Sequence, residues 1–323
     1  VGANLVAANG RLTDGVDPPG HVRMYAPNPQ QSGSSVSHFD TTVTPYELME
    51  PFYLAPNHNV EFTSELFRDL GWEIISPTVV SAVLPSSRSV QVGVPATAFA
   101  TIINVGPGTA IGCGIVPVTN IPASFISQTT NSATNAVTGS PNTPANIAVG
   151  AAQSFVFAVT PNAAIAPTDV QLNFGCANSG PAPINTGLNT LLLSASDTPV
   201  PDIVALAATI TNDGIVSIPA GGIGAFAVAA VNVGVSGNMT ASADTGGATL
   251  PANISLCETN PAIGTCISAL GPSISTQIDA NETPTFAVFV QGNGNVPFDP
   301  AANRIFVRFR DDGGVTRGST RTS

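Results

Sequence analysis

The chain has 323 residues, with nine arginines, no lysine and 20 acidic residues, and its formal net charge is −11. This acidity argues against a nucleic-acid partner, because neutralising phosphates requires a basic face. Only 9% of the residues are charged, against about 25% in typical soluble domains, so we expect a neutral polar surface with little repulsion between copies.

The chain carries the signs of an exported protein. No apolar run approaches the ~20 residues of a transmembrane helix, and the N-terminus, VGANLVAANGRLTDG, lacks a basic signal-peptide region, as if an upstream part had been removed. An even number of cysteines in a β-like, Gly- and Pro-rich chain predicts two disulfides and an extracellular location, either secreted or on the cell surface. Three pairings are possible for Cys113, Cys176, Cys257 and Cys266.

Residues 1–75 predict a small α+β domain. Residues 4–7 and 21–25 are expected to form short strands joined by the turn-rich sequence TDGVDPPG. The apolar residues between Phe62 and Leu70 recur at helical spacing. Thr63 or Ser64 is expected to cap this helix and Gly71 to end it.

This domain also holds a group of motifs with a recognisable order. They are Ser-Ser-Val-Ser-His38-Phe-Asp, then Leu-Met49-Glu-Pro, then Leu-Phe-Arg-Asp-Leu-Gly-Trp72. Together they resemble the C-terminal end of the catalytic domain of leishmanolysin-like metzincins, which are secreted zinc metallopeptidases. The resemblance implies that His38 is the third zinc ligand and that Met49 forms the Met-turn beneath the metal.

The sequence departs from that family at the central motif. A metzincin needs H-E-x-x-H, with two imidazoles one helical turn apart and a glutamate as general base. The three histidines here are His21, His38 and His58, and none of them belongs to such a motif. We therefore expect no catalysis and no cofactor, with zinc bound only if the missing half lies upstream.

Two other readings of these residues stay open. His38 is expected to bond the backbone or solvent as an ordinary loop histidine, and Met49 to be a core residue. The nearby carboxylates of Asp40, Glu47 and Glu50 are expected to be solvated, although calcium remains a candidate ligand because it prefers oxygen donors.

Residues 76–199 predict a first β-sandwich. Short runs rich in Val, Ile, Thr and Phe alternate with turn residues, from Val79–Leu84 to Thr190–Ser194. The runs at residues 98–105 and 154–159 are apolar on both faces and are expected to be central strands. Cys113 and Cys176 are expected to pair across strands or sheets. The polar sequence at residues 129–146 predicts a surface loop, with binding or assembly as its alternative role.

Residues 200–323 predict a second, related sandwich. AFATIINVG at residue 98 recurs as AFAVAAVNVG at residue 225, and FVFAV at residue 155 recurs as FAVFV at residue 286. The order is kept at a nearly constant offset, so we expect two diverged copies of one Ig-like fold. Cys257 and Cys266 flank a short Asn-Pro loop, which favours a hairpin disulfide.

The last strands show a clear alternation. Ile305, Val307 and Phe309 share one face, while Phe306, Arg308 and Arg310 share the other. The arginine face is expected to be exposed, or else to dock an acidic partner. Three Asn-x-Ser/Thr triplets could accept glycans, at Asn238, Asn253 and Asn281.

These features predict a mainly β extracellular protein with a structural or adhesive function. We expect it not to be an enzyme and to assemble with itself into a filament or surface layer, with a cell surface or glycan as a further partner. The alternative is the C-terminal region of a secreted zinc metallopeptidase. A calcium-dependent carbohydrate binder is the least supported, because aromatic residues make up only 6% of the chain.

Overall fold

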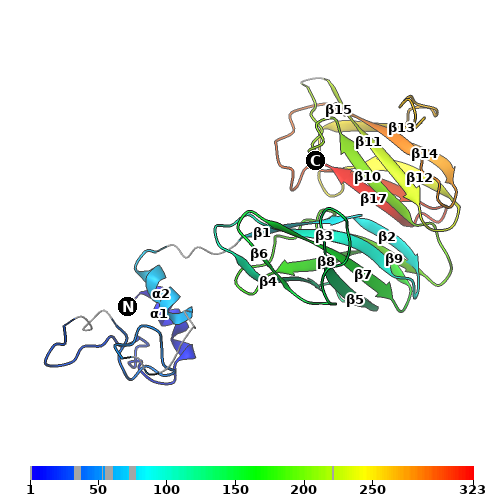
Figure 1. Cartoon of the computed structure of the whole chain (residues 1–323). Helices are drawn as coiled ribbons and strands as arrows, with labels where there is room; N and C mark the ends of the chain where they lie inside the picture. The colour runs from blue at the N-terminus through cyan, green and yellow to red at the C-terminus, as the bar shows by residue number, and fades with distance from the viewer. Residues whose placement is uncertain (1, 33–37, 53, 55–60, 73–77, 220–221) are drawn as a thin grey trace. The chain divides into compact units, whose positions relative to one another are not determined.

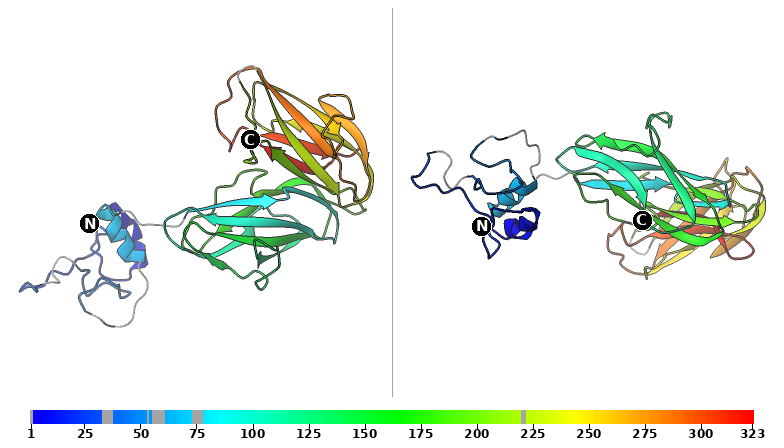
Figure 2. Two further views of the ribbon diagram at one scale, coloured as in Figure 1. Left: turned by 45° about the horizontal axis from the view of Figure 1, so that its top comes forward. Right: turned by 90° about the horizontal axis from the view of Figure 1, so that it is seen from below.

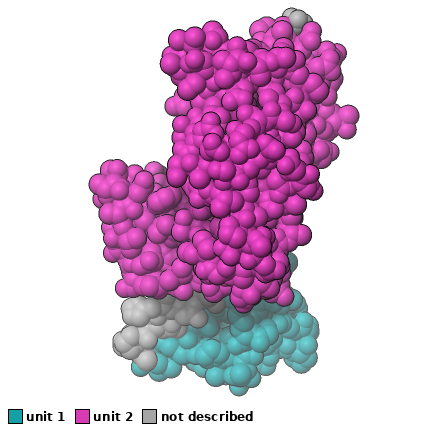
Figure 3. Space-filling view, turned by 90° about the vertical axis from the view of Figure 1, so that its right-hand side faces the viewer, with its two compact units in different colours: residues 1–75 teal, residues 76–323 magenta. Residues whose placement is uncertain are grey.

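The structure is a computed structural model that describes residues 2–32, 38–52, 54, 61–72, 78–219 and 222–323. The described residues form three short helices and 17 strands in four sheets, so the predicted mainly β class is confirmed (Figure 1). Tertiary contacts divide the chain into residues 1–75 and residues 76–323, which Figure 3 colours separately. Among the described residues, no helix is long and apolar enough to cross a membrane.

The first unit is built around two facing helices. Its helices are α1 (Ala3–Ala8), the 3-10 helix η1 (Asn9–Arg11) and α2 (Glu61–Asp69). The Asp69 carboxylate accepts the backbone amides of Asn4 at 2.9 Å and Leu5 at 3.0 Å, so α2 caps the start of α1. Desolvation opposes the charge of this carboxylate, but the hydrogen bonds outweigh it and lower the pKa of Asp69. The predicted strand at residues 4–7 is therefore wrong, because a distant side chain stabilises a helix there.

The end of α2 explains the Gly-Trp motif. Gly71 has φ +84°, and the Trp72 amide donates to the Phe67 carbonyl at 2.9 Å. This is a Schellman ending, and the rings of Phe67 and Trp72 stack 5.3 Å apart as its usual apolar contact. The predicted helix stop at Gly71 is confirmed. The predicted caps are wrong, because Thr63 and Ser64 lie inside the helix.

The rest of the first unit packs irregular chain against the helices. Phe39 and Phe62 are buried with ring centroids 5.2 Å apart. The predicted strand at residues 21–25 is replaced by isolated bridges, in which Val22 pairs with Val16 and Met24 with Phe39.

Residues 76–199 form sandwich 1, with the sheet orders β1-β3-β7-β5 and β2-β9-β8-β4-β6 (Figures 1 and 2). Its strands are β1 (Val79–Leu84), β2 (Ser87–Gln91), β3 (Ala96–Asn104), β4 (Ala110–Pro117), β5 (Ala123–Thr130), β6 (Ala145–Ile147), β7 (Ala152–Pro161), β8 (Ile165–Gly175) and β9 (Thr190–Ser196). The predicted central strands are β3 and β7, which lie in the middle of their sheet as expected.

Sandwich 1 has the strand arrangement of a constant-type immunoglobulin domain. Strands β1, β3, β7 and β5 occupy the A, B, E and D positions, and β9, β8 and β4 occupy G, F and C. Two strands are added. β2 pairs in parallel with β9, and β6 pairs with β4 although it comes after the D strand in sequence. The predicted loop at residues 129–146 is shorter than expected, because β5 continues to Thr130 and the three-residue strand β6 begins at Ala145.

Residues 200–323 form sandwich 2, with the same topology. Its sheet orders are β10-β11-β15-β13 and β14-β12-β16-β17. Its strands are β10 (Ile203–Thr209), β11 (Ile223–Asn232), β12 (Gly237–Asp244), β13 (Ala252–Thr259), β14 (Ser273–Ile278), β15 (Thr285–Gly292), β16 (Ile305–Arg310) and β17 (Thr316–Thr322). A full counterpart of β2 is missing: residues 214–216 pair only with Ser323, through two backbone hydrogen bonds.

The repeated Asn-Val-Gly sequence marks the same buried corner in both sandwiches. Asn104 and Asn232 are each 0% exposed at the end of the B strand. The Asn232 amide nitrogen donates to the carbonyls of Val235 at 2.8 Å and Ile278 at 3.0 Å, while its oxygen accepts the Gly234 amide. Asn104 makes the equivalent bonds. One side chain therefore ties the corner after the B strand to the end of the strand beside C.

Replacing Asn232 with Ala should destabilise the protein by about 1–3 kcal/mol, because the carbonyls of Val235 and Ile278 and the backbone amides of Gly234 and Asp202 lose a partner. Urea unfolding followed by circular dichroism measures the loss. Asn238→Ala is the control, since Asn238 is exposed and its change should stay within about 0.5 kcal/mol. Equal losses in the two variants would show that the corner does not depend on this amide.

Both D strands have their outer edges covered by the chain that follows them. The outer edge of β5 is bonded by residues 136–142, including Thr138 N to Thr129 O at 2.9 Å. The outer edge of β13 is bonded by residues 265–271, including Leu256 N to Gly271 O at 2.8 Å. The loop predicted at residues 129–146 thus protects a sheet edge from pairing with other chains.

An ion pair joins the two sandwiches. The Arg88 guanidinium contacts Asp202 at 2.8 Å, with the two side chains only 12% and 5% exposed. The Asp202 carboxylate also accepts the Ser89 amide at 2.9 Å. Ser87 and Ser319 are linked through the Ser87 hydroxyl, which accepts the Ser319 amide at 2.6 Å. The sandwiches therefore meet through specific, shielded polar contacts.

Removing one partner of the Arg88–Asp202 pair should lower the free energy of unfolding more than removing an exposed charge does. Asp202→Ala leaves the Arg88 cation without its counter-ion, and we expect a loss of about 3 kcal/mol or more in the free energy of unfolding. Thermal unfolding of Asp202→Ala and of Asp197→Ala, whose side chain is exposed, makes the comparison. If both variants unfold at the same temperature as the wild type, the prediction is wrong, and water screens the charges of Arg88 and Asp202.

Candidate functional site

The structure places Met49 beside the segment that carries His38. The Phe39 amide donates to the Met49 carbonyl at 2.8 Å, and the Tyr25 amide donates to the His38 carbonyl at 2.9 Å. The loop that carries Met49 therefore lies against the segment that carries His38. Met49 packs partly buried against the core of the first unit.

The structure does not bring a set of metal ligands together around His38. Among the described residues, no group of three His, Cys, Asp or Glu side chains is close enough to hold a metal ion. His21 pairs instead with Asp17 at 3.2 Å, and His58 lies outside the described residues.

The carboxylates considered for calcium have protein partners. Asp40 accepts the amide of Thr42 at 3.0 Å and its hydroxyl at 2.7 Å. Glu50 accepts the Glu47 amide at 2.9 Å, and both glutamates are buried. The expectation that Glu47 and Glu50 are solvated is therefore wrong, because the tight turn folds their side chains inward.

The two disulfides join the pairs favoured by the sequence. Cys113 pairs with Cys176, and Cys257 with Cys266. The first links β4 to the end of β8, and the second closes the hairpin that covers the edge of β13. Both therefore stabilise the sandwiches, and neither leaves a free thiol among the described residues.

The two disulfides should differ in their contribution to stability. With sequence separations of 63 and 9 residues, the chain-entropy model gives about 4 and about 2.6 kcal/mol. We expect Cys113→Ala/Cys176→Ala to lower the free energy of unfolding more than Cys257→Ala/Cys266→Ala does. Urea unfolding of the two double variants tests the order, and a reversed order would mean that packing outweighs loop closure.

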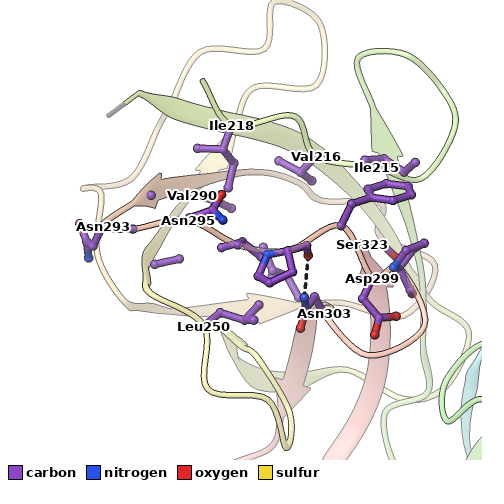
Figure 4. A pocket seen from close by; sticks show the side chains of 18 of the residues that line it. Ile215, Val216, Ile218, Leu250, Val290, Asn293, Asn295, Asp299, Asn303 and Ser323 are labelled. Atoms are coloured by element: carbon purple, nitrogen blue, oxygen red, sulfur yellow. Dashed lines mark hydrogen bonds between the residues drawn. The ribbon is translucent and has the colours of Figure 1, made fainter. Parts of the chain in front are cut away.

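A groove of about 700 Å³ opens at one end of sandwich 2 (Figure 4). Val216 and Ile218 line one side, Leu250 lies opposite, and the buried Val290 and Ile305 continue into the core. The groove exists because residues 214–216 replace a full β2-like strand and leave this end of the core open.

The groove has the chemistry of a binding site for an apolar group. The connection between β15 and β16 forms its rim, where Asn303 donates to the Pro297 carbonyl at 2.8 Å, and Phe298 stands 79% exposed. Asp299 is the one ionisable side chain among its lining residues. Such a site can hold an apolar group, but it offers no nucleophile and base in contact.

The groove at the end of sandwich 2 was not predicted from the sequence. The groove depends on the shortening of one strand, and residues 214–219 carry no motif that marks it. The arginine face at Arg308 and Arg310 was visible in the alternation of β16. Residues 184–186 of sandwich 1 lie opposite this face, and no pattern in the sequence predicted that neighbour.

Comparisons with known proteins assign no family to this chain. No protein-family model and no curated sequence matches it. Among solved structures, the secreted serine protease VesC of Vibrio cholerae aligns with 77% of this chain at 12% identity and a TM-score of 0.23. The chain spans about half of that protease, 53% of its length.

Two further structures are similar at the same low level. BcpA, the major pilin subunit of Bacillus cereus, has a TM-score of 0.23 and 8% identity, over 76% of this chain and 68% of the pilin. A Porphyromonas gingivalis protein of unknown function has a TM-score of 0.24 and 10% identity, over 75% and 97% of the two chains. TM-scores this low do not indicate a shared fold.

Proposed function

We propose that this chain is a non-catalytic extracellular structural or adhesive protein that assembles with copies of itself through β14. The observation that carries the proposal is the free edge of this strand. β14 ends the sheet order β14-β12-β16-β17, and within the part of the chain that the structure describes it pairs with β12 alone. The edges of β5 and β13 are covered, so β14 differs from them.

The composition of β14 favours pairing with another strand. Its sequence, SISTQI, has no charge and no proline, the two features that natural edges use against unwanted pairing. Ile274 and Ile278 are buried, while Ser273, Ser275 and Gln277 are exposed. A second copy of β14 can therefore add to the sheet by main-chain hydrogen bonds without desolvating a charge.

Other features agree with an extracellular assembly. The two disulfides are compatible with an oxidising compartment, and the Arg88–Asp202 pair makes the two sandwiches one compact unit. A β14–β14 contact uses the same surface on both copies and closes a pair. A filament or layer then needs a second contact, for which the groove of sandwich 2 is one candidate surface.

Lysines on the free edge should prevent the association. In Ser273→Lys/Gln277→Lys, like charges oppose each other across the paired strands. We expect the wild type to show concentration-dependent association by analytical ultracentrifugation and the variant to remain monomeric.

A matched variant separates the edge from a general charge effect. Ser124→Lys/Asn253→Lys adds the same two charges at exposed positions of the covered strands β5 and β13. It should associate like the wild type. A wild type that stays monomeric at high concentration, or a control that loses association equally, would rule out assembly through β14.

One observation also favours the C-terminal region of a secreted zinc metallopeptidase. The backbone contact between Phe39 and Met49 holds a methionine turn against the segment of His38, as the metzincin resemblance implies. N-terminal sequencing of the native extracellular protein tests this function. A longer chain with H-E-x-x-H upstream supports it, whereas native subunits that begin at Val1 and form regular fibres or sheets support the structural function.

A further inference from the structure

The arginines of this acidic chain are concentrated on one sheet face. Five of the nine arginines lie between residues 304 and 321. Arg308 and Arg310 lie on one side of β16, Arg304 directly precedes the strand in the same alternation, and Arg321 pairs with Phe306 on the neighbouring strand, so all four lie toward the outer face of the sheet. This concentration needs an explanation in a chain with a net charge of −11.

Three of these side chains, Arg304, Arg308 and Arg310, line a hollow of about 920 Å³ at the junction of the two sandwiches. We call it the junction hollow. Its lining consists of residues 184–186 from sandwich 1 and residues 244–248, 301, 302, 304, 306, 308 and 310 from sandwich 2. Its volume lies within the roughly 300–1,000 Å³ of ordinary ligand sites.

The positive charge of the hollow is only partly neutralised inside the protein. Asp244 is the one acidic side chain of the lining, and it contacts Arg308 at 2.8 Å and Arg310 at 3.8 Å. Desolvation opposes its charge, but the bonds from Arg308 and the Gly246 amide outweigh that and lower the pKa of Asp244. The single negative charge of Asp244 therefore faces the two positive charges of Arg308 and Arg310 and neutralises only one of them.

Arg304, which lines the hollow, and Arg321, which pairs with the lining residue Phe306, add positive charge without an ion pair. Arg304 donates to the carbonyls of Pro300 and Thr186, each at 2.9 Å, and is 5% exposed. Neither Arg304 nor Arg321 makes an ion pair with any described residue. Burial, followed by the charge of Arg304, lowers the pKa of Arg321 to about 10, which still leaves it protonated at neutral pH. Its Nε is buried without a hydrogen-bond partner.

The neutral groups of the hollow suit a hydroxyl-rich ligand. Asn185, Thr186 and Thr245 place amide and hydroxyl groups beside the arginines. The Arg308 guanidinium lies over one face of the Phe306 ring, 4.7 Å from its centroid, so a sugar ring cannot stack on that face. Recognition in this hollow therefore depends on charge and hydrogen bonds.

We propose that the junction hollow binds the carboxylate-bearing sugars of an acidic glycan. Planar guanidinium groups hold carboxylates by paired hydrogen bonds, and the amide and hydroxyl groups match sugar hydroxyls. An acidic peptide fits less well, because β12 and β16 are paired on both sides and offer no edge for a peptide backbone. The site is separate from β14 and does not require self-assembly.

Calorimetric titration of the full chain with trigalacturonate at low salt tests this site. The wild type should bind it and should not bind neutral trigalactose. Arg310→Glu should weaken binding by about tenfold or more, the effect of losing one charge-assisted hydrogen bond, while Arg310→Lys, which keeps the charge but not the planar fork, should weaken it by a smaller factor. Arg310 is 38% exposed, which makes both changes compatible with folding.

Arg68→Glu is the matched control, since it makes the same charge change at an exposed position in α2 and should leave affinity unchanged. The proposal is overturned if trigalacturonate does not bind, or if Arg68→Glu and Arg310→Glu weaken binding equally. Binding of tri-glutamate in preference to trigalacturonate would also overturn it, in favour of an acidic peptide. Association in the ultracentrifuge is measured separately, so a failed glycan site and a failed β14 contact give different results.

Discussion

Each sandwich depends on the side-chain amide of one buried asparagine, Asn104 in sandwich 1 and Asn232 in sandwich 2. In an Ig-like sandwich, the chain must leave the B strand and cross to the other sheet. Its backbone N–H and C=O groups in the core must still find hydrogen-bond partners there. Asn104 and Asn232 solve this by bonding the turn after B and the end of the strand beside C at once. Because the amide supplies both donors and an acceptor, no apolar side chain can replace it.

The same corner reaches the junction between the sandwiches. The oxygen of Asn232 accepts the backbone amide of Asp202 at 3.2 Å, and the Asp202 carboxylate holds Arg88. A bond that shapes the interior of sandwich 2 therefore also positions the group that joins it to sandwich 1. The junction hollow has walls from both sandwiches, so this connection is one of the contacts that hold it together.

The sequence predicted the sandwiches well because their strands alternate in burial. Val79–Leu84 is both the predicted strand and β1, and the repeat between residues 98 and 225 corresponds to β3 and β11. It failed where a partner far along the chain decides the structure. Residues 4–7 resemble a strand locally, yet Asp69 makes them a helix. For the candidate sites, β16 revealed which face carries arginines, but the closing of the hollow by residues 184–186 is a tertiary event without a local pattern.

The unequal strands at the start of each sandwich matter when the chain is pulled. β2 runs parallel to β9 over five register pairs, with its N-terminal end toward residue 76 and the C-terminal end of β9 toward sandwich 2. Tension along the chain pulls these strands in opposite directions along their length, so their hydrogen bonds are loaded together rather than one after another. In sandwich 2, the corresponding contact of residues 214–216 with Ser323 has two backbone hydrogen bonds. If the chain is pulled from its ends, we expect sandwich 2 to extend before sandwich 1.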